Sequence, residues 1–223
     1  MRITIEGPAG QLEVLQNIPE TELAGIALIA HPHPQQGGTL DNKVVQTLAK
    51  TFFGLGYASI RFNFRGVGKS SGAFANGVGE AEDALAVLEH ARQSLGSMRP
   101  VVLAGFSFGA FVQTRVAKVV AAQRLVLVGP AVGRFAVEEV PADTIVIHGQ
   151  DDDVVPLSDV FEWARPLELP VVVFPGCGHF FHGRLLQLQR VITGMWSCGS
   201  RVVDSTITDK SDASSTAYGE RPR

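Results

Sequence analysis

The residue with the clearest chemical potential is Ser107, at the centre of the motif Gly-Phe-Ser-Phe-Gly. The apolar run before it, residues 101–104, predicts a strand buried on both faces. Residues 111–122 contain neither proline nor glycine and predict a helix. A strand, a G-x-S-x-G turn and a helix form the layout of a nucleophile elbow. Its strained turn holds the serine oxygen at a helix N-terminus, where the negative charge that develops in acyl transfer is favoured.

The motif by itself is weakly specific, because glycine and serine are common in ordinary turns. In a nucleophile elbow, a side chain at Gly105 or Gly109 would crowd the neighbouring backbone. The flanking strand and helix favour this interpretation over a structural turn with a small exposed serine. Ser107 is therefore the candidate nucleophile.

A serine nucleophile needs a base, and the base needs a carboxylate that orients it. Three consecutive candidates, Asp151, Asp152 and Asp153, follow the predicted strand at residues 144–147. Only one of them can orient the base, and we expect Asp151 and Asp153 to cap the next helix or face solvent. The alternative is a solvated acidic turn without a catalytic role.

The candidate base is His179, in the loop after the last predicted strand. Four other histidines compete with it, and a lone histidine is more often structural than catalytic. The order serine, aspartate, histidine along the chain is that of the α/β-hydrolase scaffold, and it favours His179. The competitors are His31, His33, His148 and His182.

The elements that must position these residues alternate between strands and helices. This pattern predicts an α/β fold with a mainly parallel sheet, helices on both faces and an N-terminal hairpin. In such sheets the site lies beyond the carboxyl ends of the strands, where all the polar clusters above fall. The predicted strands are 1–6, 11–16, 25–30, 57–64, 101–104, 124–128, 144–147 and 171–174, and the predicted helices are 41–53, 79–95, 111–122, 156–164 and one within 179–196.

Length and composition indicate one globular domain of 223 residues. Hydrophobic residues make up 45% and charged residues 18% of the chain, and its net charge of -3 gives no reason to expect nucleic acid or an anionic membrane as a partner. No apolar run has the length of a membrane span, and the N-terminus lacks the features of a signal peptide. With only two cysteines, no disulfide framework is implied, and we expect a cytoplasmic protein.

The C-terminal residues differ in composition from the rest of the chain. The character of the sequence changes from residue 199 onward, and residues 204–223 are rich in serine, threonine and aspartate and have few apolar residues. Such a segment cannot bury enough surface to offset its ordering entropy. We therefore expect a domain at residues 1–198 and a disordered tail at 199–223.

Five motifs together give the chain a resemblance to the α/β-hydrolases over residues 1–198. The chain is most similar to the small, cap-less bacterial branch related to dienelactone hydrolase and carboxylesterases. This resemblance implies an α/β-hydrolase fold without a sizeable cap domain. The motifs are His-Pro-His-Pro at 31–34 with Gly-Gly at 37–38, the stretch 61–70, the elbow at 105–109, the stretch 148–156, and Gly-His at 178–179.

The family patterns also select among the candidates. The pattern H-G-x-x-D-x-x-V-P begins at His148 and implies that Asp152 is the acid, and G-x-G-H implies His179 rather than His182. One departure is that dienelactone hydrolases have a cysteine nucleophile where this chain has Ser107, so a dienelactone is not the expected substrate. The resemblance makes residues 65–70 structural, with Arg65 paired to a carboxylate, and their glycine spacing does not match a phosphate loop.

An oxyanion hole needs two backbone N–H groups. One is expected from Phe108, which follows the nucleophile. Relatives supply the other from the loop after residue 30, where Pro32 and Pro34 have no N–H to give. His33 is therefore the expected second donor, with Gln35 behind it. A rigid proline turn with exposed histidines is the structural alternative, and a metal site at His31 and His33 is disfavoured because no third ligand is evident.

Taken together, these residues predict a serine hydrolase of carboxylic esters, with Ser107, His179 and Asp152 as its triad. A binding module that retains the fold, or a serine acyltransferase or peptidase, is the alternative, because a triad does not fix the leaving group. We expect a small-molecule ester substrate and no cofactor or metal. The connection at residues 131–143 is too short for a cap domain, which favours short or exposed acyl groups.

Overall fold

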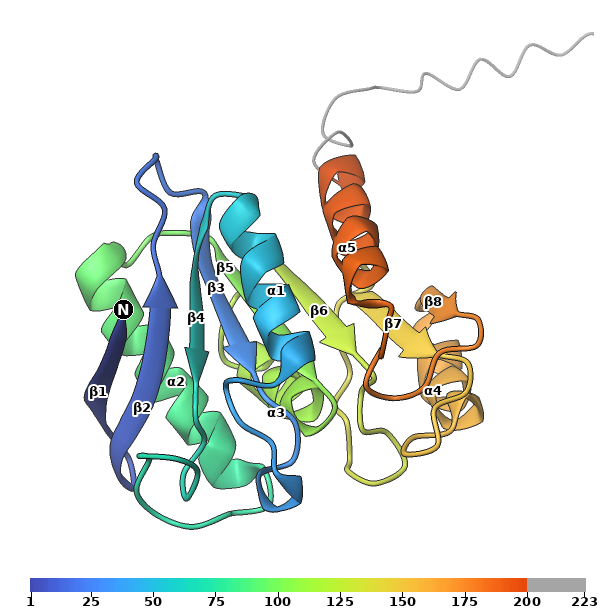
Figure 1. The fold of residues 1–223 in the computed structure, drawn as a ribbon, viewed down its shortest axis with the longest axis horizontal. Coiled ribbons are helices and arrows are strands. Elements are labelled where there is room, and N and C mark those ends of the chain that lie inside the picture. The colour runs from blue at the N-terminus through green and yellow to red at the C-terminus, as the bar shows by residue number, and fades with distance from the viewer. Residues whose placement is uncertain (200–223) are drawn as a thin grey trace, which may run out of the picture.

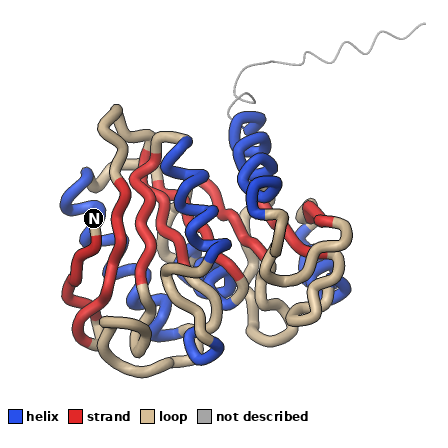
Figure 2. The backbone as a smooth tube through the Cα atoms, viewed as in Figure 1, coloured by secondary structure: helices blue, strands red, loops and turns tan. Residues whose placement is uncertain are grey.

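An eight-stranded sheet organises the chain in the computed structural model, which describes residues 1–199 and, for 197–199, the backbone alone (Figures 1 and 2). Neighbouring strands follow the order β1-β2-β4-β3-β5-β6-β7-β8. The strands are β1 (Arg2–Gly7), β2 (Gly10–Asn17), β3 (Gly25–Ala30), β4 (Tyr57–Phe62), β5 (Val101–Phe106), β6 (Arg124–Val128), β7 (Ile145–Gly149) and β8 (Val171–Phe174).

Strand direction divides the sheet into two parts. The β1–β2 hairpin is antiparallel, and β2 pairs antiparallel with β4. From β4 to β8 every pair is parallel, so the carboxyl ends of six strands lie along one edge, the lower edge in Figure 1. The expected α/β-hydrolase sheet is thereby confirmed.

Helices cover both faces because the central strands are apolar on both sides. In β3, Ile26 and Leu28 belong to the core under α2 and α3, whereas Ala27 and Ile29 face α1 and α5. Val146 of β7 packs with α4. The helices are α1 (Lys43–Gly54), α2 (Val78–Leu95), α3 (Phe108–Ala117), α4 (Leu157–Ala164) and α5 (Leu185–Gly199), with short 3-10 turns η1 (Pro34–Gln36) and η2 (Arg165–Leu167).

Both predicted ends of the helix after the elbow were wrong. Helix α3 begins at Phe108 rather than at residue 111, because Gly109 belongs to the helix. It ends at Ala117 rather than at residue 122, since the chain must turn back to begin β6 at Arg124. Helix α5 begins only at Leu185, after a glycine at residue 183 whose φ of 70° is left-handed.

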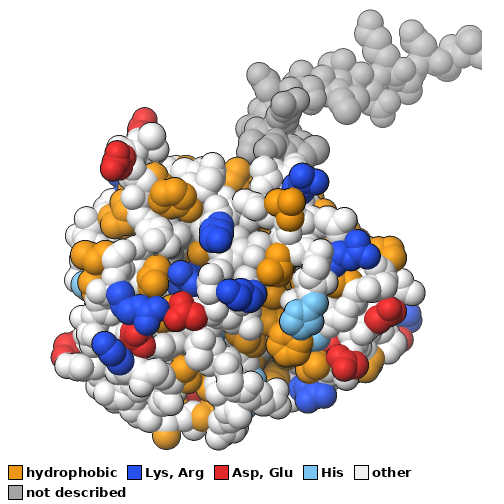
Figure 3. Space-filling model, in the orientation of Figure 1, with side chains coloured by type: hydrophobic (Ala, Val, Ile, Leu, Met, Phe, Trp, Pro, Cys, Tyr) orange, Lys and Arg blue, Asp and Glu red, His pale blue; other side chains and the backbone are white. Residues whose placement is uncertain are grey.

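No cap domain covers the carboxyl edge within residues 1–199, as predicted. The connection between β6 and β7 has no helix, and its Phe135 ring packs against Phe108 and Phe111. None of the helices in the described part of the chain has the length and apolar character to cross a bilayer. Acidic and basic side chains are interspersed on the face that carries α1 and α5 (Figure 3). The predicted C-terminal tail falls, from residue 200, outside the described residues.

Candidate active site

The turn between β5 and α3 holds Ser107 in a strained conformation. Its φ of 56° and ψ of -118° are rare for a residue with a side chain. Its N–H donates to the carbonyl of Val128 at 2.9 Å. A Cβ at Gly105 would lie 2.4 Å from the Gly109 carbonyl oxygen, and one at Gly109 would lie 2.4 Å from the Ala30 carbonyl oxygen. The turn therefore requires both glycines, as the motif predicts.

Three of the predicted site residues form one hydrogen-bonded chain. His179 Nε2 lies 3.0 Å from Ser107 Oγ, and His179 Nδ1 lies 2.6 Å from Asp152 Oδ2. All three side chains are buried, with Ser107 7% exposed. The Phe106 ring lies 4.9 Å from the imidazole, measured between ring centroids, and restricts its movement. Residues 72 positions apart in the chain are thus brought into contact.

The carboxylate of Asp152 is held on both sides. Its Oδ1 accepts the N–H groups of Val154 and Val155 at 2.9 and 2.7 Å, which leaves Oδ2 for the imidazole of His179. Burial by itself would raise the pKa of Asp152, but the hydrogen bonds from His179 and Val155 outweigh it and lower that pKa. Asp152 is therefore ionised at neutral pH, whereas Asp151 and Asp153 are exposed.

The histidine at the end of β7 also touches this carboxylate. His148 Nε2 lies 2.9 Å from the Val155 carbonyl oxygen and 3.3 Å from Asp152 Oδ2. Burial lowers the pKa of His148, so its ring is neutral. Among the described residues no hydrogen bond joins His148 to Ser107, so His148 supports the carboxylate and is not placed to act as the base.

The remaining histidines have other surroundings. His31 is fully buried, and its Nδ1 lies 2.6 Å from the Pro32 carbonyl oxygen while its Nε2 accepts the Phe64 N–H at 3.1 Å. Both ring nitrogens are occupied, so His31 is neither a free base nor a metal ligand. His182 is exposed. Among residues 1–199, no group of three or more His, Cys, Asp or Glu is placed to hold a metal ion.

A cleft of about 280 Å³ opens onto the Ser107 side chain. The two predicted oxyanion donors, His33 and Phe108, both line it, and within the described residues neither of their N–H groups donates a hydrogen bond. The His33 ring lies among the rings of Phe74, Phe108 and Phe135. Burial lowers the pKa of His33, so this wall is neutral. The full lining is His33, Gln36, Ser107, Phe108, Ala131, Arg134, Phe135 and Val154.

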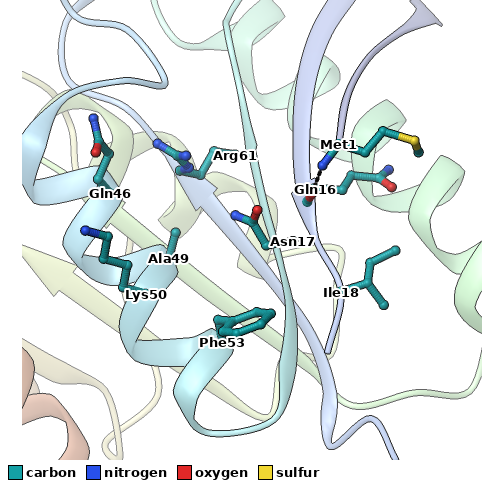
Figure 4. A pocket seen from close by; sticks show the side chains of 9 residues that line it. All are labelled: Met1, Gln16, Asn17, Ile18, Gln46, Ala49, Lys50, Phe53 and Arg61. Carbon is teal, nitrogen blue, oxygen red and sulfur yellow. Dashed lines mark hydrogen bonds between the residues drawn. The ribbon is translucent and has the colours of Figure 1, made fainter. Parts of the chain in front are cut away.

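A larger hollow, of about 770 Å³, lies between β2 and α1 (Figure 4) and shares no lining residue with the cleft at Ser107. It presents amide, cationic and apolar groups but no nucleophile paired with a base. Volume alone would select this hollow, whereas the chemistry selects the cleft at Ser107. Its lining is Met1, Gln16, Asn17, Ile18, Gln46, Ala49, Lys50, Phe53 and Arg61.

The loop after β4 is structural, as the resemblance implies. The guanidinium of Arg65 pairs with Asp83 at 2.8 Å and with Glu82 at 3.2 Å, both on α2. The Asp83 side chain is fully buried, and its Oδ2 also accepts the Arg65 N–H. This pairing fixes the loop to the helix and leaves no free phosphate-binding site there.

Five of the residues that line the cleft were not predicted as site residues, among them Arg134 and Phe135. Arg134 and Phe135 lie in the connection after β6, which the sequence marks only as too short for a lid. Neither residue stands in a motif that would mark it in the sequence. Their place in the cleft depends on how the loop folds back over α3. For His148, the signal was its place at the end of a strand four residues before Asp152.

Comparisons with known proteins support this fold and its family. The family model described as X-Pro dipeptidyl-peptidase (S15 family) matches residues 12–139, a span that contains Ser107 but neither Asp152 nor His179. A curated Rickettsia prowazekii protein, described as uncharacterized, is 31% identical over 214 residues, which cover 86% of each chain.

Solved structures are similar over most of the chain. An α/β serine hydrolase homologue from Coxiella burnetii is 42% identical, with a TM-score of 0.81 over 87% of this chain and 96% of that one. A lid-less α/β serine hydrolase from Xanthomonas campestris is 36% identical, with a TM-score of 0.82 over 89% and 94% of the two chains. With a family match over more than half its length, the chain belongs to the α/β serine hydrolases, in the family that the S15 X-Pro dipeptidyl-peptidase model describes.

Proposed function

We propose that this protein hydrolyses carboxylic esters through an acyl-enzyme on Ser107. The observation that carries the proposal is the hydrogen-bonded chain from Ser107 through His179 to Asp152, placed on a strained elbow beside an open cleft. Each member has one role. Ser107 is the nucleophile, His179 the general base and then the general acid, and Asp152 the group that orients the imidazole.

The distances support this order of proton transfers. Asp152 is ionised, so His179 Nδ1 carries the proton that joins them, and Nε2 is left free to accept the proton of the Ser107 hydroxyl. Attack on the ester carbonyl leaves an imidazolium beside a carboxylate, which stabilises it. His179 then gives its proton to the departing alkoxide, and the same residue later activates the water that releases the acid.

The negative oxygen of the tetrahedral intermediate needs donors in the cleft. The N–H groups of His33 and Phe108 have no other acceptor among the described residues and line the same cleft as Ser107. Phe108 is also the first residue of α3, so the helix dipole adds to its effect. We assign the oxyanion hole to these two groups.

The lining of the cleft favours an ester over an X-Pro dipeptide. An enzyme that cuts a dipeptide from the amino end of a peptide must hold a charged ammonium group, for which carboxylates are the natural partners. None of the residues that the structure places in this cleft is acidic. We therefore rank the peptidase reaction second, on the family match alone.

The test combines a serine-reactive probe with a substrate panel. A fluorophosphonate should label the wild-type protein on Ser107, and Ser107→Ala should abolish the label and lower kcat by on the order of 10⁶. Short-chain p-nitrophenyl esters should be cleaved faster than matched anilides or Xaa-Pro anilides. Unlabelled wild-type protein would indicate the non-catalytic binding module, and faster cleavage of the Xaa-Pro anilide would indicate the peptidase.

A further inference from the structure

One charged side chain shares the cleft with the nucleophile. Arg134 lies in the connection between β6 and β7 and lines the same 280 Å³ cleft as Ser107 and Phe108. Its Nε donates to the Val154 carbonyl at 2.9 Å, and Val154 is itself part of the cleft wall. This bond anchors the guanidinium at its base, and its two terminal nitrogens are left to meet another group.

No carboxylate in the described part of the chain neutralises this guanidinium. Among residues 1–199, no ion pair joins Arg134 to an aspartate or glutamate. The Asp159 carboxylate lies against Gly133, the preceding residue, yet it hydrogen-bonds Ser158 instead. Arg65, in the loop after β4, differs in that its guanidinium is paired with two acids. Arg134 is therefore a cation without a fixed counter-charge at the mouth of the site.

The other residues that line the cleft have no charge that competes with that of Arg134. Apart from His33, these residues carry apolar, amide or hydroxyl groups, and burial lowers the pKa of His33. Among the described residues that line the cleft, only Arg134 is therefore charged at neutral pH. The rings of Phe108 and Phe135 border the cleft, and Arg134 itself is exposed, so solvent screens its charge in part. A planar guanidinium in such a setting binds a carboxylate through two parallel hydrogen bonds.

We propose that Arg134 determines specificity for small esters that carry a carboxylate, on either the acyl or the alcohol side of the scissile bond. This inference rests on the proposed esterase function and adds the chemical class of its substrate. The small cleft volume and the absence of a lid in the described residues restrict such a substrate to a short dicarboxylic monoester or an ester of a small hydroxy acid.

The test uses two substrate pairs that differ only in charge. On the acyl side, p-nitrophenyl adipate monoester is compared with the matching adipamate, in which a primary amide replaces the carboxylate. On the alcohol side, 4-carboxyphenyl butyrate is compared with 4-carbamoylphenyl butyrate. The measured quantity is the ratio of kcat/KM for the acid to that for the amide, in wild type, Arg134→Gln and Arg134→Glu.

We expect wild-type protein to prefer the acid in at least one pair, and Arg134→Gln to lower that ratio roughly 5- to 50-fold, the range between an exposed ion pair and a charged hydrogen bond. Arg134→Glu should lower it further, and 1 M salt should weaken the wild-type preference. The matched control Arg165→Gln changes an exposed arginine on η2, outside the cleft, and should leave the ratio unchanged.

The outcomes separate this inference from the proposed function. If the fluorophosphonate labels Ser107 and neutral esters are cleaved, but neither pair shows an acid preference that depends on Arg134, the specificity role is wrong and the esterase stands. If Arg134→Gln lowers acid and amide alike, the residue is structural and the inference also fails. If no ester is cleaved and Ser107 is not labelled, the esterase function fails and its substrate class falls with it.

Discussion

Two loops at the carboxyl edge of the sheet each carry a buried histidine, and they use it in opposite ways. After β3, both ring nitrogens of His31 are taken up by the Pro32 carbonyl and the Phe64 N–H. After β8, His179 meets only side chains, the Asp152 carboxylate on one nitrogen and the Ser107 hydroxyl on the other. The first ring joins pieces of backbone, whereas the second joins two groups that can exchange a proton.

This difference has an electrostatic counterpart. Burial without a carboxylate lowers the pKa of His31 to about 4, so its ring stays neutral over the physiological range. His179 is equally buried but lies beside an ionised carboxylate that can stabilise an imidazolium. Burial therefore does not distinguish a structural from a catalytic histidine in this protein, and the identity of its partners does.

After loss of the nucleophile itself, the largest expected effect comes from removing the carboxylate partner of His179. Asp152→Asn should lower kcat by about 10⁴, because an amide allows the wrong tautomer of His179. Asp151→Asn and Asp153→Asn, at exposed neighbouring positions, are matched controls and should have little effect. The measurement is kcat on a short p-nitrophenyl ester. A large loss at either neighbour, with Asp152→Asn active, would show that a different aspartate orients the base.

The loop after β3 should contribute to catalysis through its backbone rather than its rings. His33→Pro removes the N–H assigned to the oxyanion hole and should lower kcat by roughly 10² to 10³. His33→Ala retains that N–H and should keep most of the activity. Circular dichroism checks that the proline variant is folded. Equal losses in the two variants would point instead to a role for the imidazole.

The structural role of His31 should appear in stability. The folded pKa of about 4 lies below the ordinary value of 6.5, so between these values the unfolded chain binds a proton that the folded chain does not. Above pH 6.5 His31 is neutral in both states, and its burial does not reduce the free energy of unfolding. As the pH falls to 4, protonation of the unfolded chain lowers that free energy by about 3 kcal/mol.

Urea unfolding of wild type and His31→Gln between pH 7 and 4 measures this contribution. The variant should show a shallower loss of stability with falling pH, and the exposed His182→Gln should follow the wild type. The same pH dependence in wild type and His31→Gln would mean that His31 is not buried in its neutral form.

The smallest expected effect concerns the length of the acyl chain. No lid covers the cleft in the described residues, so each added CH₂ that stays in water forgoes about 0.8 kcal/mol of burial. The exposed ring of Phe180, beside His179, offers only a limited apolar wall. Across p-nitrophenyl esters, kcat/KM should be highest for short chains. An optimum at laurate, below the micellar limit, would require a closed acyl tunnel.

Much of this protein could be predicted from local sequence signals. Apolar runs and turn residues fixed the strands and most helices, because these depend on near neighbours in the chain. The strained turn at Ser107 followed from the two glycines of its motif. The choice of Asp152 and His179 rested on their order along the chain and on family patterns, and the structure brings both to Ser107.

Other features depended on tertiary structure alone. The sheet order places β3 beside β5, and the loops after β7 and β8 meet at the serine from 45 and 72 positions along the chain, a convergence that periodicity does not encode. Which histidine nitrogens are occupied by backbone is decided by that packing. The same is true of Arg134, whose place in the cleft comes from the fold of a loop without a motif. Sequence determined which chemical groups are available, and the packing of distant segments determined which of them face one another.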